Sequence, residues 1–337
     1  MPTRATAAAS RSQLWLGLLV LYIVWGSTYL GIAVAVETIP PFLMAASRFA
    51  LAGLVLLTWS VARAGGEFRA PSRREWRDSA IVGAALLGGG MGMVAWGEQT
   101  IPSGIAALII ALMPVWVALF GRLFLGERLP AIAIMGIVIG FIGVGILVGP
   151  TITGQTGALD PLGLLALLIS PISWSLGSLY ASHRATLPRQ PLVATGLQMV
   201  CGAAVLFAFA LLSGEPGRFD PSAISRESLI ALAYLTVIGS LLAFTVYGWL
   251  LRMAPLPWIA TYAYVNPVVA VILGAIILGE PIEPRTVLAG GVIVAAVALI
   301  VTARGRMARP QAAADPTTPP APSGQPVAPA PSRSASG

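Results

Sequence analysis

Residues 102–127 read PSGIAALIIALMPVWVALFGRLFLGE, and residues 255–280 read PLPWIATYAYVNPVVAVILGAIILGE. The two stretches align without a gap at an offset of 153 positions, and eight of the 26 positions are identical. The identities include Pro102 with Pro255, Pro114 with Pro267, Gly126 with Gly279 and Glu127 with Glu280. An ungapped match of this length indicates a duplicated unit, and a duplicated unit constrains the whole fold.

The repeat lies in a very apolar chain. Mean hydropathy is +0.85, and only 10% of the residues are charged, against about 25% in soluble domains. A helix that crosses a bilayer needs about 20 mostly apolar residues. Ten stretches meet this requirement: Leu14–Val36, Pro41–Val61, Trp76–Trp96, Ser103–Leu123, Pro130–Val148, Leu162–Ala181, Leu192–Leu212, Leu229–Leu251, Trp258–Leu278 and Thr286–Thr302. Because these stretches lack the period-2 alternation of barrel strands, we predict an all-α polytopic membrane protein with ten transmembrane helices.

The basic residues of the chain are distributed unevenly between the loops on the two sides of the membrane. All 20 basic residues are arginines, and no single segment gathers them as a nucleic-acid-binding surface would. With the N-terminus inside, 16 arginines fall on the cytoplasmic side and three on the opposite side, and Arg48 lies within a span. The positive-inside rule therefore predicts that both termini are cytoplasmic, and we expect a lipid bilayer rather than nucleic acid as the partner.

The repeated segments are the fourth and ninth spans, which are five spans apart. Because five is odd, the second copy enters the membrane from the opposite side. Gly26-Ser27-Thr28-Tyr29 also resembles Gly177-Ser178-Leu179-Tyr180, at an offset of 151. We therefore predict two inverted five-helix repeats, residues 14–148 and 161–303, between a cytoplasmic tail of residues 1–13 and a disordered Pro/Ala-rich cytoplasmic tail of residues 304–337. Inverted repeats are typical of secondary transporters that work by alternating access.

The prolines and glycines of the repeat have distinct expected roles. Pro114 and Pro267 fall in the middle of their spans, where a missing backbone hydrogen bond kinks the helix, so they are candidate hinges. A purely structural bend is an equal alternative. Gly126 and Gly279 resemble helix C-caps. Glu127 and Glu280 follow them at the membrane interface, where we favour a structural role in capping or loop bonding over a role in substrate binding.

Two ionisable residues lie at or near membrane depth, where charge is costly and usually functional. Arg48 is about a third of the way into the second span, and Glu98 follows the third span near the same side. The two residues could form an ion pair that fixes helix packing. They could also bind the carboxylate and ammonium of an amino-acid-like substrate, or Glu98 could carry a coupling proton.

Aromatic and amide side chains supply further candidates for substrate binding. Trp25 and Tyr29 share a face of the first span, and Trp96 lies near the end of the third. Tyr262 and Asn266 are one turn apart on the ninth span, and the Asn266 amide needs a partner in its apolar surroundings. Tyrosine and tryptophan combine an apolar ring with a polar tip, which suits an amphipathic solute. An aromatic belt at the bilayer interface is the alternative for the shallower residues.

The residues required for other functions are missing from the sequence. His183 is the only histidine and Cys201 the only cysteine, and paired carboxylates do not occur in mid-span. We therefore expect no metal site, no catalytic residues and no cofactor, and no motif for nucleotide binding is present. Whether the chain acts as a homodimer stays open.

Five motifs resemble those of the EamA-type branch of the drug/metabolite transporter superfamily: Trp25-Gly-Ser-Thr-Tyr29, Ser47-Arg48-Phe49, Ile101-Pro-Ser-Gly-Ile-Ala-Ala-Leu108, Leu125-Gly-Glu127 and Tyr262-Ala-Tyr-Val-Asn-Pro-Val268. The resemblance covers about residues 14–303. It implies ten helices in two inverted EamA repeats, in which helices one to four and six to nine surround a central cavity and helices five and ten lie at the periphery. It also implies export of amino acids, other small metabolites or drugs.

We therefore expect an exporter of small organic solutes in the inner membrane of a bacterium. The solute would bind near Trp25, Tyr29, Arg48, Trp96, Glu98, Tyr262 and Asn266. The alternatives are a scaffold or assembly protein that transports nothing and, less favoured, a lipid-modifying membrane enzyme. A central cavity would favour transport, and a fully packed core would favour the scaffold.

Overall fold

A computed structural model of the chain describes residues 10–64, 68–153, 159–253, 256–259 and 261–307. The predicted tails fall largely outside these ranges, since residues 1–9 and 308–337 are not among them. All regular elements in the described residues are helices, which confirms the all-α fold. The elements are α1 (Arg11–Val36), α2 (Pro41–Ala64), α3 (Arg73–Gly83), η2 (Ala84–Gly92), α4 (Met93–Gly97), α5 (Ser103–Ile110), α6 (Met113–Leu125), α7 (Ala131–Thr153), α8 (Pro161–His183), α9 (Pro191–Leu212), α10 (Glu215–Arg218), η3 (Pro221–Ala223), α11 (Arg226–Tyr234), η4 (Leu235–Leu242), α12 (Ala243–Met253), α13 (Leu256–Ile259), α14 (Tyr262–Ile277) and α15 (Pro284–Met307).

Polar residues set where several long helices begin. Ser10, Ser72, Asp160 and Ser225 each accept a hydrogen bond from a backbone N–H of the first helical turn. Such N-caps satisfy donors that a helix cannot pair internally. The local sequence therefore fixes where these helices begin.

Nine helices in the described residues are long and apolar enough to cross a membrane. The expected ninth span, Trp258–Leu278, differs from this pattern, because the structure has α13 there and then the 16-residue helix α14. At about 1.5 Å per residue, α14 is about 24 Å long, which is shorter than a hydrocarbon core of about 30 Å. The Thr261 hydroxyl donates to the Trp258 carbonyl at the end of α13, so a polar contact stabilises the break inside the apolar run.

Two π-helical segments interrupt long helices at corresponding places. η2 connects α3 to α4, and η4 connects α11 to α12. The first residues of the two segments, Ala84 and Leu235, are 151 positions apart, which is also the offset of the Gly-Ser-x-Tyr match. π-Helical turns are rare and are often found at functional sites.

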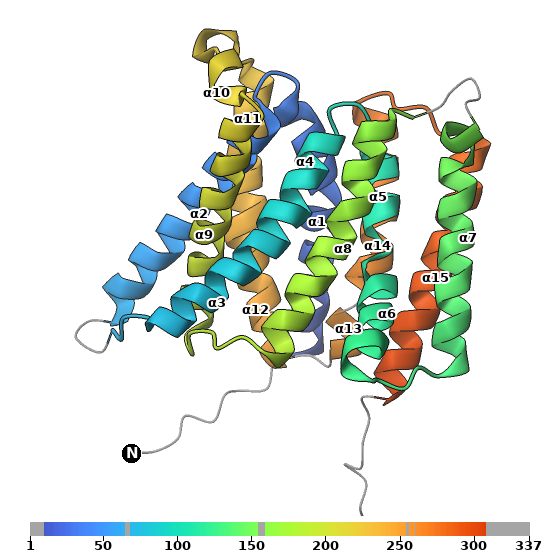
Figure 1. The fold of residues 1–337 in the computed structure, drawn as a ribbon, viewed down its shortest axis with the longest axis horizontal. Coiled ribbons are helices and arrows are strands. Elements are labelled where there is room, and N and C mark those ends of the chain that lie inside the picture. The colour runs from blue at the N-terminus through green and yellow to red at the C-terminus, as the bar shows by residue number, and fades with distance from the viewer. Residues whose placement is uncertain (1–9, 65–67, 154–158, 254–255, 260, 308–337) are drawn as a thin grey trace, which may run out of the picture.

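The helices pack in pairs that correspond between the two halves of the chain. α2 packs on α9, and α7 packs on α15 at one end of the bundle, as Figure 1 shows. α1 contacts α14 and the α11–α12 helix, and α8 correspondingly contacts α5–α6 and the η2–α4 helix. α2 and α9 cross closely at Gly53 and Gly196, where an added Cβ would come within about 3 Å of the facing backbone carbonyl.

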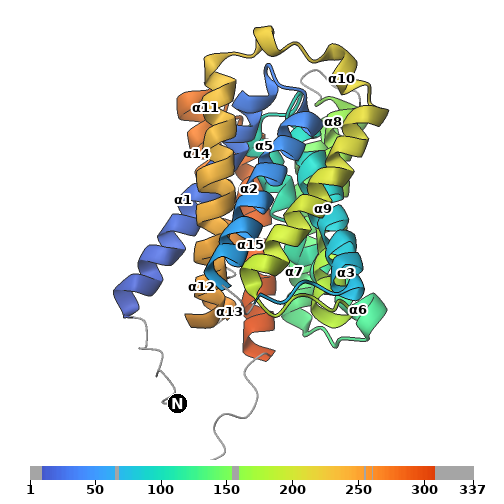
Figure 2. The ribbon, with the colours of Figure 1, turned by 90° about the vertical axis from the view of Figure 1, so that its left-hand side faces the viewer.

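The described chain begins and ends at the same edge of the bundle. In Figures 1 and 2, the start of α1 and the end of α15 both lie at the bottom. We call this the terminal edge, and we call the edge that carries α10 the far edge. In the same views, α5–α6 runs from the far edge to the terminal edge, whereas α14 runs in the reverse direction.

Candidate functional site

A cavity of about 470 Å³ lies between helices from both halves of the chain. It extends from Ala111 and Pro114, where α5 meets α6, and from Asn266 in the second turn of α14. Its other end is at Glu127, Ser182 and His183, at the ends of α6 and α8. Those ends lie at the terminal edge (Figure 1), so the cavity connects the middle of the bundle with that edge. Its volume is typical of sites for small organic molecules, which occupy about 300–1,000 Å³.

Most of the cavity wall is apolar, and its polar groups are few. Tyrosines 29, 247 and 262 and the Asn266 amide line the wall, among residues such as Ile110 and Val301. Asn266 is 7% exposed, and its Oδ1 atom has no hydrogen-bond partner among the described residues. A buried acceptor without a partner costs free energy, and a bound N–H or O–H donor would recover that free energy.

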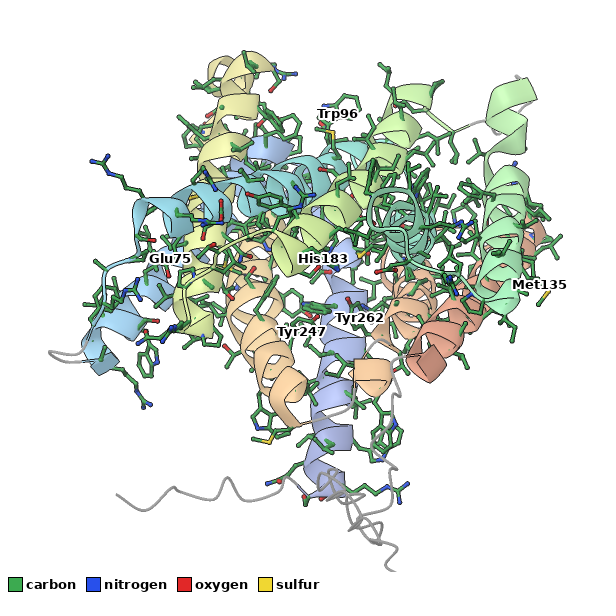
Figure 3. All side chains as sticks on the ribbon, turned by 60° about the horizontal axis from the view of Figure 1, so that its bottom comes forward. Glu75, Trp96, Met135, His183, Tyr247 and Tyr262 are labelled. Atoms are coloured by element: carbon green, nitrogen blue, oxygen red, sulfur yellow. The ribbon has the colours of Figure 1, made fainter. Side chains whose placement is uncertain are left out.

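An aromatic cluster supports one side of the cavity. The Trp25 ring lies 4.9 Å from the Tyr262 ring, 5.2 Å from Tyr247 and 5.7 Å from Phe244, measured between centroids. Figure 3 shows Tyr247 and Tyr262 side by side, and their planes are nearly perpendicular. Trp25 does not itself line the cavity, so it acts on the wall by packing against two tyrosines that do.

Arg48 is buried away from the cavity. It is 3% exposed, its Nε atom donates to the Ser240 hydroxyl at 2.9 Å, and its guanidinium lies over the Phe49 ring. Ser240 belongs to η4, so the arginine holds α2 against the π-helical segment. Arg48 and Glu98 form no ion pair within 4.0 Å in the described residues, although each is close enough to affect the other electrostatically.

Glu98 follows α4 directly and is 6% exposed. Neither of its carboxylate oxygens has a hydrogen-bond partner in the part of the chain that the structure describes. Glu98 does not line the cavity. It lies in the turn after α4, which packs on α8 and α2.

Trp96 lies apart from the other predicted site residues. It lines a second cavity, of about 500 Å³, at the far edge, together with Glu37, Asp160 and Asp220. In Figure 3, Trp96 lies near the top, well away from the labelled tyrosines. The structure therefore places Tyr29, Tyr262 and Asn266 around one cavity and Trp96 at another. Trp25 is partly buried behind the tyrosines, and Arg48 and Glu98 are buried away from both cavities.

The two prolines of the repeat both line the first cavity. Pro114 is in the first turn of α6, directly after the break between α5 and α6 at Ala111 and Leu112. Pro267 is inside α14, next to Asn266. Each proline removes one backbone donor at the cavity wall, where a bend is tolerated because it faces open space.

The Gly-Glu pairs that end the repeats adopt the same backbone. Gly126 and Gly279 have φ angles of 68° and 66°, which confirms their expected role at helix C-termini. The N–H of the following glutamate donates to a carbonyl six residues back, at 3.2 Å in both copies. The Glu280 carboxylate then accepts the N–H groups of Ser103 and Gly104, at 2.7 and 3.1 Å, which are in the first turn of α5.

We call this contact the Glu280 clasp, because it joins the end of α14 to the start of α5 at the far edge. A carboxylate is favourable there, since it satisfies unpaired donors and meets the positive end of the helix dipole. The structural role expected for Glu280 is therefore confirmed. Glu127 also has an interaction partner, and it lines the terminal-edge end of the cavity.

Sequence reasoning missed two groups of residues. Tyr247 lines the cavity, but it lies in a long apolar run that gave no reason to prefer it over other tyrosines. Glu215 is 1% exposed, and its carboxylate accepts the N–H groups of Phe42 and Leu43 at the start of α2. No role was expected for Glu215 from the sequence, because only the fold shows which helix its carboxylate caps.

The sequence profile of the EamA-like transporter family matches residues 13–149 and 161–302, which together are most of the chain. This chain belongs to the EamA-like transporter family. It is 39% identical to the uncharacterized inner membrane transporter YedA of Escherichia coli (strain K12) over 285 residues, which are 84% of this chain and 89% of that protein. It is 25% identical to the uncharacterized transporter YvbV of Bacillus subtilis (strain 168), over 87% of this chain and 92% of that protein.

The likeness extends further in sequence and in structure. The chain is 25% identical to the chloroplastic WAT1-related protein At3g02690 of Arabidopsis thaliana, over 85% of this chain and 69% of that protein. A solved crystal structure matches with a TM-score of 0.58 at 22% identity, and the match covers 89% of this chain and 99% of the other. At that identity, the match establishes the fold of the EamA-like transporter and nothing about its substrate.

Proposed function

We propose that this EamA-like transporter exports small organic solutes, amino-acid-like metabolites or drugs, from a bacterial cell by alternating access. The observation that carries the proposal is the cavity of about 470 Å³ with its three tyrosines and the unpartnered Asn266 Oδ1 atom. A mostly apolar wall with an acceptor that has no partner among the described residues suits an amphipathic solute that donates a hydrogen bond. A scaffold protein would not need such a cavity in its centre.

We propose further that the chain crosses the membrane ten times, as two inverted five-helix repeats. Three observations support this: α5–α6 and α14 run in opposite directions, the helices pack in corresponding pairs, and both repeats end in the same Gly-Glu turn. α14 would then be the short ninth crossing, with α13 completing its path at the terminal edge. Exchange of the conformations of two such halves is the basis of alternating access.

The distribution of arginines and the name of a relative support the location. The terminal edge is the cytoplasmic one in this proposal, because the positive-inside rule assigns 16 of the 20 arginines to that side. YedA is described as an inner membrane transporter, so we place this chain in the inner membrane as well. The cavity then connects with the cytoplasm, which is the loading state of an exporter.

A reconstitution experiment tests the proposal. Liposomes that contain the purified transporter are loaded with radiolabelled amino acids or aromatic amines, one solute at a time. The rate of solute release is compared with the rate from liposomes that contain the Asn266→Leu variant. Release of at least one solute that Asn266→Leu slows about tenfold is the expected result, since a hydrogen bond of about 1.4 kcal/mol is lost. If no solute is released faster than from empty liposomes, the transport proposal is wrong.

Topology is tested separately by labelling single cysteines. In a Cys201→Ser background, Glu127→Cys and Glu280→Cys are expected to react with a membrane-impermeant maleimide from opposite faces of the membrane. Reaction of both positions from one face would contradict the inverted arrangement.

A further inference from the structure

The least satisfied ionisable group in the described residues is the carboxyl of Glu98. Both of its oxygens lack a hydrogen-bond partner although the residue is 6% exposed. A buried carboxylate normally accepts two or more hydrogen bonds, or pairs with a cation. Glu98 does neither, so the packing around it provides for a neutral group rather than an anion.

The neighbouring elements do not supply the missing partner. From α2, the Arg48 guanidinium is directed to Ser240 and forms no ion pair with Glu98. From α1, the Tyr29 side chain lies close enough to interact electrostatically. From α8, which packs on α4, the Asp160 carboxylate is occupied by Gly163 N–H and the Thr100 hydroxyl.

The remaining charged neighbour is Glu280, which repels an anionic Glu98. The Glu280 carboxyl accepts the Ser103 and Gly104 N–H groups, and an ionised carboxylate accepts such bonds better than a neutral acid does. Two carboxyl groups that repel each other do not both ionise readily where one of them is buried. The proton therefore belongs on Glu98, whose oxygens have no hydrogen bond to lose among the described residues.

Desolvation acts in the same direction. Glu98 lies in the turn between two spans, and its burial, followed by the charge of Glu280, raises the pKa of the carboxyl well above its usual range, against an opposing effect of Arg48. The state in which the clasp is formed thus binds a proton more tightly than a separated, hydrated state would. By linkage, a rising pH then favours opening.

We propose that Glu98 is a proton-binding site that controls the Glu280 clasp and couples proton binding to the conformational change of transport. With Glu98 protonated, the clasp holds the start of α5 against the end of α14, and that contact is present in this structure. When Glu98 loses its proton, its charge faces Glu280 in the same buried region, and separation of α5 from α14 lets water reach both carboxylates. The inference rests on the proposed transport function, but proton binding and clasp opening can be measured without a substrate.

The first experiment detects the proton itself. Infrared difference spectra of the purified transporter between acidic and alkaline buffer report the carbonyl stretch of protonated carboxylic acids. The expected result is a band in the wild type that is lost in Glu98→Gln and kept in Glu37→Gln, a control at an exposed carboxylate of the same edge. A band that survives in a folded Glu98→Gln variant would overturn the proposal. Glu98→Asp, which keeps a carboxyl and is expected to keep a shifted band, provides the second variant if Glu98→Gln does not fold.

The second experiment detects the clasp. In a Cys201→Ser background, Ser103→Cys places a thiol beside the clasp, where the serine side chain is fully buried. Labelling with an impermeant maleimide is expected to rise at least tenfold from acidic to alkaline pH with Glu98 present. It is expected to stay slow at every pH in Glu98→Gln, and to be fast at every pH in Glu280→Gln.

The outcomes separate the two proposals. An equal pH dependence of labelling with and without Glu98 would overturn the proton site, whatever the transport assays show. If the infrared band and the labelling behave as expected but no solute moves in liposomes, the proton site stands and the transport proposal fails. The reaction of a maleimide with any thiol depends on pH. Each labelling rate is therefore divided by the rate measured at the same pH for Glu37→Cys, an exposed position of the same edge.

Discussion

The two copies of the repeated segment end alike, but they differ in the middle. Their last residues, Gly126-Glu127 and Gly279-Glu280, have nearly the same φ angles and the same hydrogen bond at 3.2 Å. In the interior, Met113 aligns with Asn266, and both line the cavity. The comparison teaches that identical residues make the same turn at the ends of the two segments, whereas Met113 and Asn266 give the cavity wall different chemistry at aligned positions.

The largest expected effect comes from removing an architectural residue. Glu280→Ala leaves the Ser103 and Gly104 N–H groups of α5 without their acceptor, so we expect a loss of about 2–4 kcal/mol in the free energy of unfolding. Thermal unfolding in detergent measures it. Glu283→Ala is the matched control, because its contact with Arg285 is at the surface and contributes under about 1 kcal/mol. Equal losses for both variants would remove the special role of the clasp.

Much of this architecture could be predicted from the sequence. Apolar runs gave helices within a few residues of those observed, and the glycine before each glutamate gave the C-terminal caps. These features depend on local physics, namely the length of an apolar stretch and the conformational freedom of glycine at positive φ. The break before Tyr262 was missed because Thr261 is a single polar residue inside an otherwise apolar run.

The site was less predictable because it depends on which helices meet. Asn266, Tyr29 and Tyr262 were expected from their depth and do share a cavity. Arg48 and Glu98 were expected to act on a substrate, but their surroundings are packed, and only the fold shows that Ser240 binds the arginine. The π-helical segments η2 and η4 had no signal in composition or periodicity, since a shift from i+4 to i+5 bonding leaves no residue signature.

The next largest loss of stability is expected at Trp25, whose counterpart in the second half of the chain is an exposed leucine. Trp25 contacts three aromatic rings, whereas Leu176, its counterpart at an offset of 151, is 40% exposed. Trp25→Leu is expected to cost about 2 kcal/mol, since aromatic pairs contribute about 0.5–1.5 kcal/mol each. The melting temperature should fall in detergent, and solute release should slow as Tyr247 and Tyr262 lose their support. Leu176→Trp is the reciprocal control, and a change beyond about 0.5 kcal/mol there would contradict the comparison.

Substitution of Asn266, which aligns with Met113 in the cavity wall, is expected to affect solute release rather than stability. Asn266→Leu is expected to slow solute release about tenfold, which corresponds to about 1.4 kcal/mol, because the bound solute loses its acceptor. Stability should hold or rise, since an unpartnered buried oxygen is removed. Met113→Leu is the matched control at the other copy, with release expected within about twofold of wild type. Equal slowing by both variants would mean that cavity shape, and not the amide, determines binding.

The smallest effect tests whether the two ends are truly equivalent. Gly126→Ala and Gly279→Ala each place a side chain at positive φ, where the added Cβ meets no atom within 4 Å, so the cost is that of the backbone alone. We expect about 1 kcal/mol at both sites, with values that agree closely. Gly145→Ala is the control, because its Cβ also meets open space but it lies inside the helix α7, where alanine stabilises by about 0.5–1 kcal/mol. If alanine stabilises the protein at Gly145 and destabilises it at the two turns, then the backbone conformation, and not the loss of glycine, sets the change in the free energy of unfolding.

A large difference between the values at Gly126 and Gly279 would instead mean that the two turns differ in energy despite their shared geometry.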